Sequence, residues 1–398
     1  MGSFPHESGP SKRQLGPKWT EMGPKAPIFA KKRGQLGFAK VNLPLAAKDR
    51  VCYVGRVMRR ALLILLAASL ATLLLLPTQA AERSPDTQRK GVVTQTYRGW
   101  DECLIMEASG VKAIVAPAIG GRIVHYSVGG ENIIFENPAS FGKTLGNTQT
   151  NFWVGGYQCD IGPELRGIPD HEALWMGLYK WHLPRDFAVQ VTSERDQNVG
   201  VQIEKEILIE PGSGDLGITQ TMRNVSNKEV AYCLWDRTLC KNDGFAFFPL
   251  NKRSRFKAGW SLRRTVAGKY VYDGTSPGAP NVKILKNILV ARCEGPPTKV
   301  GADSDAGWIA YVLGRMLFVK YFPYMPEGNY SDGGNSVELY FDERVAELEP
   351  LSPEVTLRPN ETYSFPEKWT LIELKEEVLT FEQVRAVVKQ IPASPFKR

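Results

Sequence analysis

Histidine is scarce in this sequence, with four residues among 398. No Cys-x-x-Cys pair occurs, and no cysteine and histidine are spaced as ligands of a structural zinc ion. The chain also lacks a glycine-rich phosphate loop, an alternation of strand and helix patterns, and any internal repeat. These absences argue against a zinc-stabilised fold, a nucleotide-binding α/β fold and a repeat architecture, and they predict a protein with no metal and no cofactor.

Long apolar runs are also missing, with one exception at residues 61–76, which carry no charge and are mostly leucine and alanine. Met58-Arg59-Arg60 precedes this run, and small residues near Ala80 and Ala81 follow it. The three-part pattern is typical of a secretory signal peptide, here Met58–Ala80, although an uncleaved anchor is the alternative. The run is shorter than the roughly 20 residues of a membrane-spanning helix. We therefore expect a periplasmic or secreted protein with no stable membrane span after signal cleavage.

The basic charge of the chain comes from its beginning. Residues 1–57 contain 11 Lys/Arg and 3 Asp/Glu and show no amphipathic period, a composition that does not build a core. We expect them to be a non-native or disordered extension ahead of a true start at Met58, or else an unusually long leader. They carry +8, and Arg59 and Arg60 add two charges, so a total of +8 leaves −2 for the rest. The net charge thus gives no support for binding to nucleic acid.

Five cysteines follow the predicted signal, namely Cys103, Cys159, Cys233, Cys240 and Cys293. An odd number leaves at least one free thiol. An oxidising compartment permits disulfides, but the spacing assigns no pair.

The pattern after residue 81 is overwhelmingly that of β-strands. Residues 199–209 are expected to form a strand, and most positions from 201 to 209 alternate between apolar and polar, which is typical of a half-buried antiparallel strand. Similar short runs recur between Gly, Pro and Asn turns, at 111–116, 122–128, 132–136, 187–192, 216–223, 230–239, 308–313, 317–321, 336–341, 345–348 and 369–373. This spacing predicts an all-β antiparallel sandwich over residues 81–375.

Residues 376–398 are expected to form a short amphipathic helix and a tail. Thr380 and Gln383 have the spacing of a capping box, and an apolar stripe follows them. Two stretches, 142–183 and 243–297, lack a regular pattern and are expected to be long loops, where sites usually lie.

Three segments of the chain resemble the galactose-mutarotase-like superfamily, the β-supersandwich of the aldose 1-epimerases. Residues 120–124 followed by 132–135 are similar to its opening strands, and His171 with 177–181 is similar to its His…Gly-aromatic-x-x-Trp segment. Residues 347–350 and 357–363 resemble its closing "L-E-P … L-x-P-G-E" strands. The resemblance spans nearly the whole predicted domain and implies an all-β supersandwich that interacts with sugars, in an uncharacterised bacterial branch.

The resemblance also implies an active site. In the epimerases a glutamate base and a histidine acid move protons between the ring oxygen and the anomeric hydroxyl, and Glu349 matches that glutamate. The acid histidine is expected near residues 234–238, where the sequence has no histidine. Asp236 would serve as the acid only if burial raised its pKa. Glu349 and Asp236 are therefore the candidate catalytic residues, and the missing histidine argues against ordinary mutarotase chemistry.

Further residues are candidates for binding a saccharide or polysaccharide. Aromatic rings stack on the apolar faces of sugars, although core packing is their commoner role. Glu347 lies on the same strand face as Glu349, and Asp160 with Glu164 forms an acidic turn that could border a site. The candidate binding residues are His171, Arg122, Trp235, Trp181, Tyr157 and Glu347.

Three functions remain open from the sequence. The first is an exported carbohydrate-binding protein without ordinary mutarotase catalysis. The second is an epimerase-like enzyme in which Glu349 is the base and Asp236 or His171 is the acid. The third is a structural module of the cell envelope, which predicts a flat or filled sheet face in place of a pocket lined by tryptophan and carboxylates.

Overall fold

The computed structural model describes residues 88–148 and 152–396. The predicted extension and signal peptide at residues 1–80 lie outside these described residues. Within them, no helix is long and apolar enough to cross a membrane.

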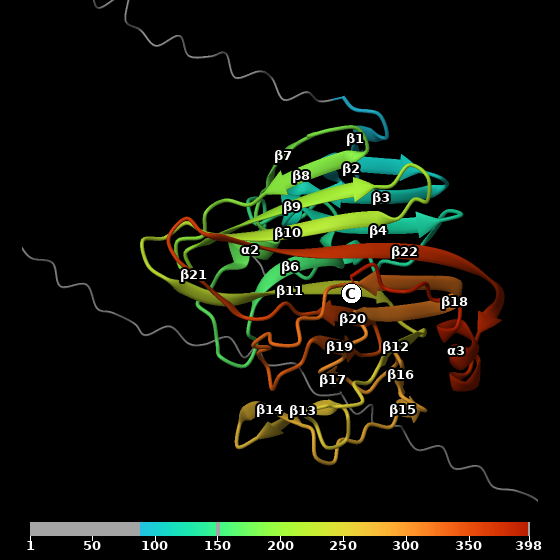
Figure 1. Cartoon of the computed structure of the whole chain (residues 1–398). Coiled ribbons are helices and arrows are strands. Elements are labelled where there is room, and N and C mark those ends of the chain that lie inside the picture. Colours follow the sequence, from blue (N-terminus) through green and yellow to red (C-terminus); the bar gives the residue numbers. More distant parts are fainter. Residues whose placement is uncertain (1–87, 149–151, 397–398) are drawn as a thin grey trace, which may run out of the picture. The chain divides into compact units, whose positions relative to one another are not determined.

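Two antiparallel sheets make up most of the described chain (Figure 1). The larger has thirteen strands: β1 (Val92–Tyr97), β2 (Trp100–Ala108), β3 (Val111–Ala116), β4 (Arg122–Val128), β5 (Glu131–Asn132), β6 (Gly156–Gly162), β11 (Val230–Lys241), β13 (Ser261–Val266), β14 (Lys269–Asp273), β17 (Thr298–Ala302), β19 (Val337–Phe341), β20 (Val345–Pro350) and β21 (Val355–Leu357). Its central order is β4-β6-β11-β20-β19-β17-β13. The predicted all-β antiparallel sandwich is confirmed.

The smaller sheet has nine strands in the order β15-β16-β12-β18-β22-β10-β9-β8-β7. Their bounds are β7 (Lys180–His182), β8 (Ala188–Thr192), β9 (Val201–Ile209), β10 (Leu216–Asn224), β12 (Phe245–Pro249), β15 (Val282–Leu285), β16 (Ile288–Arg292), β18 (Trp308–Tyr321) and β22 (Thr362–Val378). Along β9 the odd-numbered side chains are buried and the even-numbered ones are half-buried, as its alternating sequence predicts.

The main core lies between the sheets. Tyr126 and Tyr157 of the larger sheet pack against Trp369 of the smaller one, with ring centroids 5.7 and 5.1 Å apart. Phe318 lies 5.1 Å from the same indole. Each such side chain contributes roughly 1.5–3 kcal/mol through burial, so this aromatic cluster fixes the sheets face to face.

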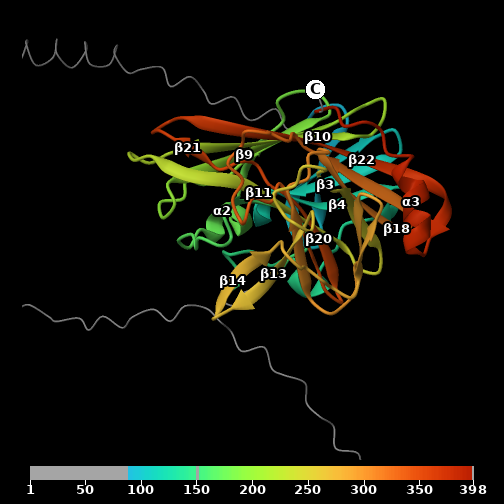
Figure 2. The same cartoon turned by 60° about the horizontal axis from the view of Figure 1, so that its bottom comes forward.

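The two stretches expected to be loops contain strands. Residues 243–297 hold five, β12 to β16, with β13 and β14 forming a hairpin (Figure 2). Both faces of β12 are buried, because Phe245 and Phe247 pack in a second cluster while Phe248 packs in the main core. The wholly buried β6 lies in the other stretch, with helix α2 (Glu172–Met176). A strand buried on both faces shows no polar alternation, which is why the sequence did not reveal it.

Helix α3 (Phe381–Val388) is the predicted C-terminal helix. Thr380 and Gln383 form the expected capping box. Val384 and Val387 are buried in the second cluster, beside Phe245 of β12. The five cysteines of the described chain are buried and unpaired.

Candidate functional site

A row of polar side chains crosses the face of the larger sheet that points away from the main core. Leu234, Val300 and Leu348 belong to that core. Because side chains alternate along a strand, their neighbours Trp235, Lys299 and Glu349 lie on the opposite face. This row receives residues from six neighbouring strands, in the order β6, β11, β20, β19, β17 and β13.

A pocket of about 280 Å³ lies over the centre of this row. Two tryptophans, a tyrosine, three glutamates and four cationic side chains line it, namely Trp153, Glu164, Trp235, Arg237, Arg263, Lys299, Tyr340, Arg344, Glu347 and Glu349. It is small, strongly polar and partly aromatic. We refer to it as the Glu349 pocket.

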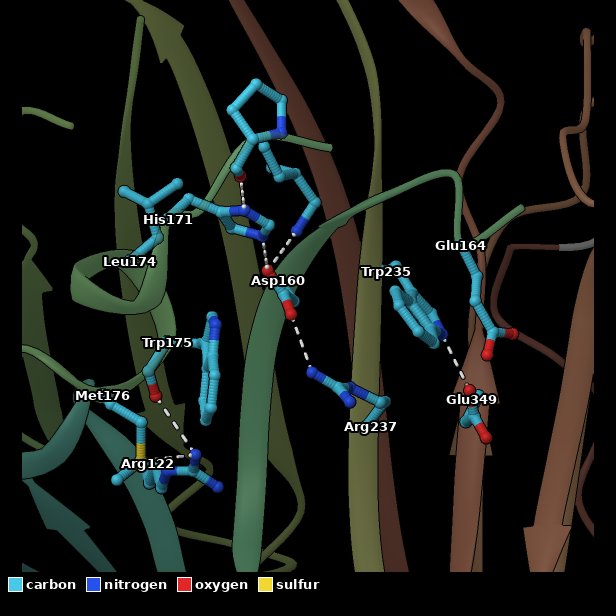
Figure 3. A network of polar contacts seen from close by, with 12 residues as sticks. Arg122, Asp160, Glu164, His171, Leu174, Trp175, Met176, Trp235, Arg237 and Glu349 are labelled. Carbon is cyan, nitrogen blue, oxygen red and sulfur yellow. Dashed lines mark hydrogen bonds and ion pairs between the residues drawn. The ribbon is translucent and has the colours of Figure 1, made fainter. Parts of the chain in front are cut away.

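Glu349 is fully buried at the floor of the Glu349 pocket. Its Oε2 accepts hydrogen bonds from Trp235 Nε1 at 2.8 Å and from Lys299 Nζ at 2.9 Å (Figure 3 shows the bond to Trp235). Its Oε1 has no hydrogen-bond partner among the described residues. A buried acceptor left without a donor costs about 1–3 kcal/mol, so this oxygen is a site for an incoming donor.

Lys299 stands between three carboxylates. Its Nζ lies 2.9 Å from Glu164, 3.0 Å from Glu338 and 2.9 Å from Glu349. Burial disfavours the charged lysine, but these three neighbours outweigh it and raise the pKa of Lys299. One ammonium does not neutralise three carboxylates, and burial together with Glu349 raises the pKa of Glu338 to about 7 against the lowering effect of Lys299.

Glu347 lines the same pocket and is half-buried. It comes directly before the core residue Leu348 in the sequence. Burial and, next, the charge of Glu349 raise the pKa of Glu347 to about 7. Glu347 forms no hydrogen bond or ion pair with the described part of the chain, although Arg237 and Lys299 act on it electrostatically. Its carboxyl group is therefore free to meet a ligand.

His171 lies beside the pocket, in a network of hydrogen bonds with Asp160 and the backbone of Pro169 (Figure 3). Its Nε2 lies 2.9 Å from Asp160 Oδ1, and its Nδ1 lies 2.6 Å from the carbonyl of Pro169. Burial lowers the pKa of His171, but the Asp160 carboxylate outweighs burial and the pKa is raised. With an acceptor at each ring nitrogen, His171 suits the doubly protonated form and has no free nitrogen for a substrate.

Arg237 connects this hydrogen-bond network to the Glu349 pocket. Its Nη2 donates to Asp160 Oδ2 at 2.7 Å, and its guanidinium carbon lies 4.5 Å from the centroid of the Trp235 ring. His171, Asp160, Arg237 and Trp235 thus form one continuous set of contacts that ends at Glu349. The structure brings the predicted Glu347, Glu349 and Trp235 into one pocket and places His171 outside its lining.

Asp236 requires a correction, because it does not share a pocket with Glu349. It points into the main core, where Lys320 Nζ of the smaller sheet donates to its Oδ1. Burial and the nearby Glu367 carboxylate raise the pKa of Asp236. One residue along β11 separates the two faces of the sheet, so Trp235 and Arg237 face the pocket while Asp236 faces the core.

Three other predicted binding residues also lie outside the Glu349 pocket. Tyr157 is fully buried against Trp369 in the main core. Arg122 is buried and donates to the carbonyls of Gly155 and Trp175, each at 3.1 Å (Figure 3 shows the bond to Trp175). Trp181 lies on β7 at the edge of the smaller sheet, with its Nε1 3.4 Å from Glu102.

Several residues of the Glu349 pocket were not predicted from the sequence. Lys299 lies on the five-residue strand β17, which was not predicted, and Arg263 of β13 lies in the 243–297 stretch that was expected to be a loop. Arg263 in fact pairs with Glu164, a residue that the acidic turn had suggested as a site border. The two residues of each pair are far apart in the sequence, so no local pattern indicated that they would meet.

Comparisons with known proteins support a fold but no named family. No family model and no curated protein sequence matches the chain. A galactose mutarotase-like protein from Lactobacillus casei superposes with a TM-score of 0.50 at 12% identity, over 68% of this chain and 100% of that one. One from Clostridium acetobutylicum gives 0.46 at 11% identity, over 71% and 98%. The first of these superpositions, together with the two antiparallel sheets, shows that the chain has the galactose-mutarotase-like β-supersandwich fold.

Proposed function

We propose that this protein binds a saccharide in the Glu349 pocket. The observation that carries the proposal is Glu349 Oε1, a fully buried acceptor without a donor among the described residues. A sugar hydroxyl supplies such a donor and accepts hydrogen bonds in return. The fold supports the proposal, because the solved structures it resembles include galactose mutarotase-like proteins.

The lining of the pocket suits a sugar ring. Arginine and lysine side chains offer donors, and Glu347 and Glu349 offer acceptors. Trp153 and Tyr340 are half-buried, so their rings are available to the apolar face of a sugar. Trp235 is only 8% exposed and contributes its N–H to Glu349. A polar pocket lined in part by aromatic rings argues against the third function, a purely structural module of the cell envelope.

Ordinary mutarotase catalysis is not part of this proposal. No histidine of the described part of the chain lines the Glu349 pocket, and both ring nitrogens of His171 face protein acceptors. A glutamate–histidine pair therefore has no acid here. Glu349 lines the pocket while Asp236 points into the main core beside Lys320, which supports leaving this pairing out of the proposal.

We also propose that the protein is exported and meets its saccharide outside the cytoplasm. The signal-like pattern of Met58–Ala80 supports this. An exported protein meets polymeric or exogenous sugars more readily than phosphorylated intermediates.

A glycan array followed by calorimetry tests saccharide binding. We expect one class of glycan to bind, and we expect Glu349→Gln to weaken that binding at least tenfold, because the amide removes the charged acceptor. Glu376→Gln is the matched control, since Glu376 is exposed at the end of β22 in the smaller sheet. Absence of binding to every glycan, or equal binding by Glu349→Gln and the wild type, would refute the proposal.

A further inference from the structure

A second pocket lies over strands β1 to β4 of the larger sheet, and its lining differs from that of the Glu349 pocket in every described residue. Its volume is about 690 Å³, and Tyr97, His125 and Ser127 are among the residues that line it. His125 and Ser127 flank the core residue Tyr126 on β4, so they point to the sheet face away from the main core. Ser127 is 2% exposed, so its hydroxyl lies at the floor of this cavity, which we call the Ser127 pocket.

A chain of hydrogen bonds runs from the Ser127 hydroxyl to a carboxylate. Ser127 Oγ lies 2.8 Å from His125 Nε2, and His125 Nδ1 lies 3.2 Å from the hydroxyl of Tyr97. That hydroxyl donates to Glu136 Oε1 at 2.8 Å. The four residues therefore form a relay in the order serine, histidine, tyrosine, glutamate.

The contacts of Glu136 determine where the protons of this relay lie. Arg98 Nε and Asn132 Nδ2 each donate to Glu136 at 3.2 Å. An ionised carboxylate only accepts hydrogen bonds, so the single proton of Tyr97 points to Glu136. The Tyr97 oxygen then accepts from His125, whose Nδ1 carries the proton and whose Nε2 is left as an acceptor. This is the tautomer that a general base needs toward a serine hydroxyl.

We propose that Ser127 is a nucleophile, with His125 as its general base, in the hydrolysis of an uncharged carboxylic ester with a short acyl group. A serine beside a base that a third group orients is the arrangement of nucleophilic catalysis. Tyr97 is the orienting residue in this relay. The proposal goes beyond saccharide binding and depends on no residue of the Glu349 pocket.

The environment of His125 suits a base. Burial lowers the pKa of His125, against the opposing effect of the Glu136 charge. The ring is therefore neutral at neutral pH and ready to accept a proton. Once protonated, it is stabilised through Tyr97 by the carboxylate at the end of the relay.

The lining of the Ser127 pocket offers a cation and an apolar wall. Lys112 is the direct partner of Ser127 in the register between β3 and β4, so the two side chains share one sheet face. Lys112 Nζ lies 2.7 Å from Glu107, and both side chains are exposed. Such a surface pair contributes little, so the ammonium group is available to the oxyanion that forms beside Ser127. Ile105 and Ile114 provide the wall for the acyl group.

The reaction balances with water as the second reactant. Ser127 Oγ bonds to the acyl carbon while its proton passes to His125 Nε2. The bond from the acyl carbon to the alcohol oxygen then breaks, and that oxygen takes the proton from His125. Water attacks the acyl group on Ser127 and gives a proton to His125. The carboxylic acid leaves as this proton returns to Ser127 Oγ.

Ester hydrolysis by the purified full chain tests the proposal, with p-nitrophenyl acetate and p-nitrophenyl butyrate as probes. We expect p-nitrophenol to be released faster than in buffer. Ser127→Ala and His125→Gln should each lower that rate about 100-fold or more. The matched controls Ser364→Ala and His182→Gln should keep it, because both residues are exposed on the smaller sheet.

Tyr97→Phe tests the orienting role of the tyrosine. The variant removes the oxygen that accepts from His125 Nδ1. We expect kcat to fall about tenfold or more with KM unchanged, because the substrate does not depend on this oxygen for binding. A rise in KM with kcat unchanged would contradict the role of Tyr97 in the relay.

A fluorophosphonate probe on the wild type provides a readout that needs no variant. We expect a covalent adduct on the peptide that contains Ser127, located by mass spectrometry. Hydrolysis no faster than in buffer, no adduct, or an adduct at another serine overturns the proposal. A Ser127→Ala variant that is folded by circular dichroism and keeps the wild-type rate also overturns it. If that variant does not fold, the site of the wild-type adduct decides.

Discussion

Trp235 donates a hydrogen bond of 2.8 Å from its indole to Glu349, although the two residues are 114 positions apart in the sequence. They meet because β11 and β20 are neighbours in the larger sheet. Residues 234–238 are the segment in which the resemblance expects an acid histidine. In this chain the segment supplies an N–H donor to the glutamate, so the partner of the predicted base is a fixed donor and not a proton shuttle.

Replacing Trp235 by phenylalanine tests this contact. The variant leaves the buried Glu349 Oε2 with Lys299 as its one remaining donor among the residues that the structure describes. We expect a loss of about 1–3 kcal/mol in the free energy of unfolding, measured by chemical denaturation, and weaker saccharide binding by calorimetry. Trp181→Phe is the control, since Trp181 lies outside the pocket at the edge of the smaller sheet. Unchanged stability and binding in Trp235→Phe would contradict the role given to this bond.

Asp160→Asn should lower the pKa of His171. Burial of His171 disfavours its charge, and the Asp160 carboxylate is the main interaction that raises the pKa. In the wild type, this raised pKa contributes stability that is present below about pH 6.5 and is lost as pH rises through the folded-state pKa. NMR titration of the histidine ring signals measures the change, with the exposed His182 as an internal reference. An equal or higher pKa for His171 in the variant would show that another group holds its proton.

Lys205→Met should stabilise the protein at low pH. Lys205 is fully buried, and burial lowers its pKa to about 7, although its Nζ donates to the Gly120 carbonyl at 2.7 Å. Between pH 7 and about 10.5 the unfolded chain binds more protons than the folded one, so wild-type stability rises with pH in that window. We expect the free energy of unfolding of the variant to exceed that of the wild type by on the order of 2 kcal/mol at pH 6, once the loss of the hydrogen bond is subtracted. This difference should disappear by pH 10.

Denaturation curves at pH 6, 8 and 10 check this prediction. Lys389→Met serves as the control, because Lys389 is exposed at the end of α3. A gain for Lys205→Met that does not depend on pH would mean that packing, and not the buried charge, causes it.

Export predicts a defined N-terminus. We expect N-terminal sequencing of the exported protein to begin at or near Ala81, because cleavage after Ala80 leaves small residues at the −3 and −1 positions. A mature chain that retains residues 1–57 would contradict both the signal peptide and the start at Met58.

The sequence was sufficient for features that depend on local pattern. Alternation within residues 199–209 predicted the strand observed as β9, and the Thr380–Gln383 spacing predicted the cap of α3. The resemblance of the "L-E-P" segment suggested Glu349 as a site residue, and strand alternation placed Glu347 on the same face; both side chains line one pocket in the structure. Where both faces are buried, as in β6 and β12, alternation vanishes and the prediction failed.

Only the tertiary structure decided which charged side chains meet. Lys299 of β17 contacts Glu338 of β19, Glu349 of β20 and Glu164 in the turn after β6, and Glu164 is more than a hundred positions away in the sequence. The direction of each β11 side chain, which sends Trp235 to the pocket and Asp236 to the core, depends on the register with β6 and β20. Long-range pairing sets this register, so the sequence by itself determined the sandwich and its candidate glutamates, while the packing of its strands determined the pocket around them.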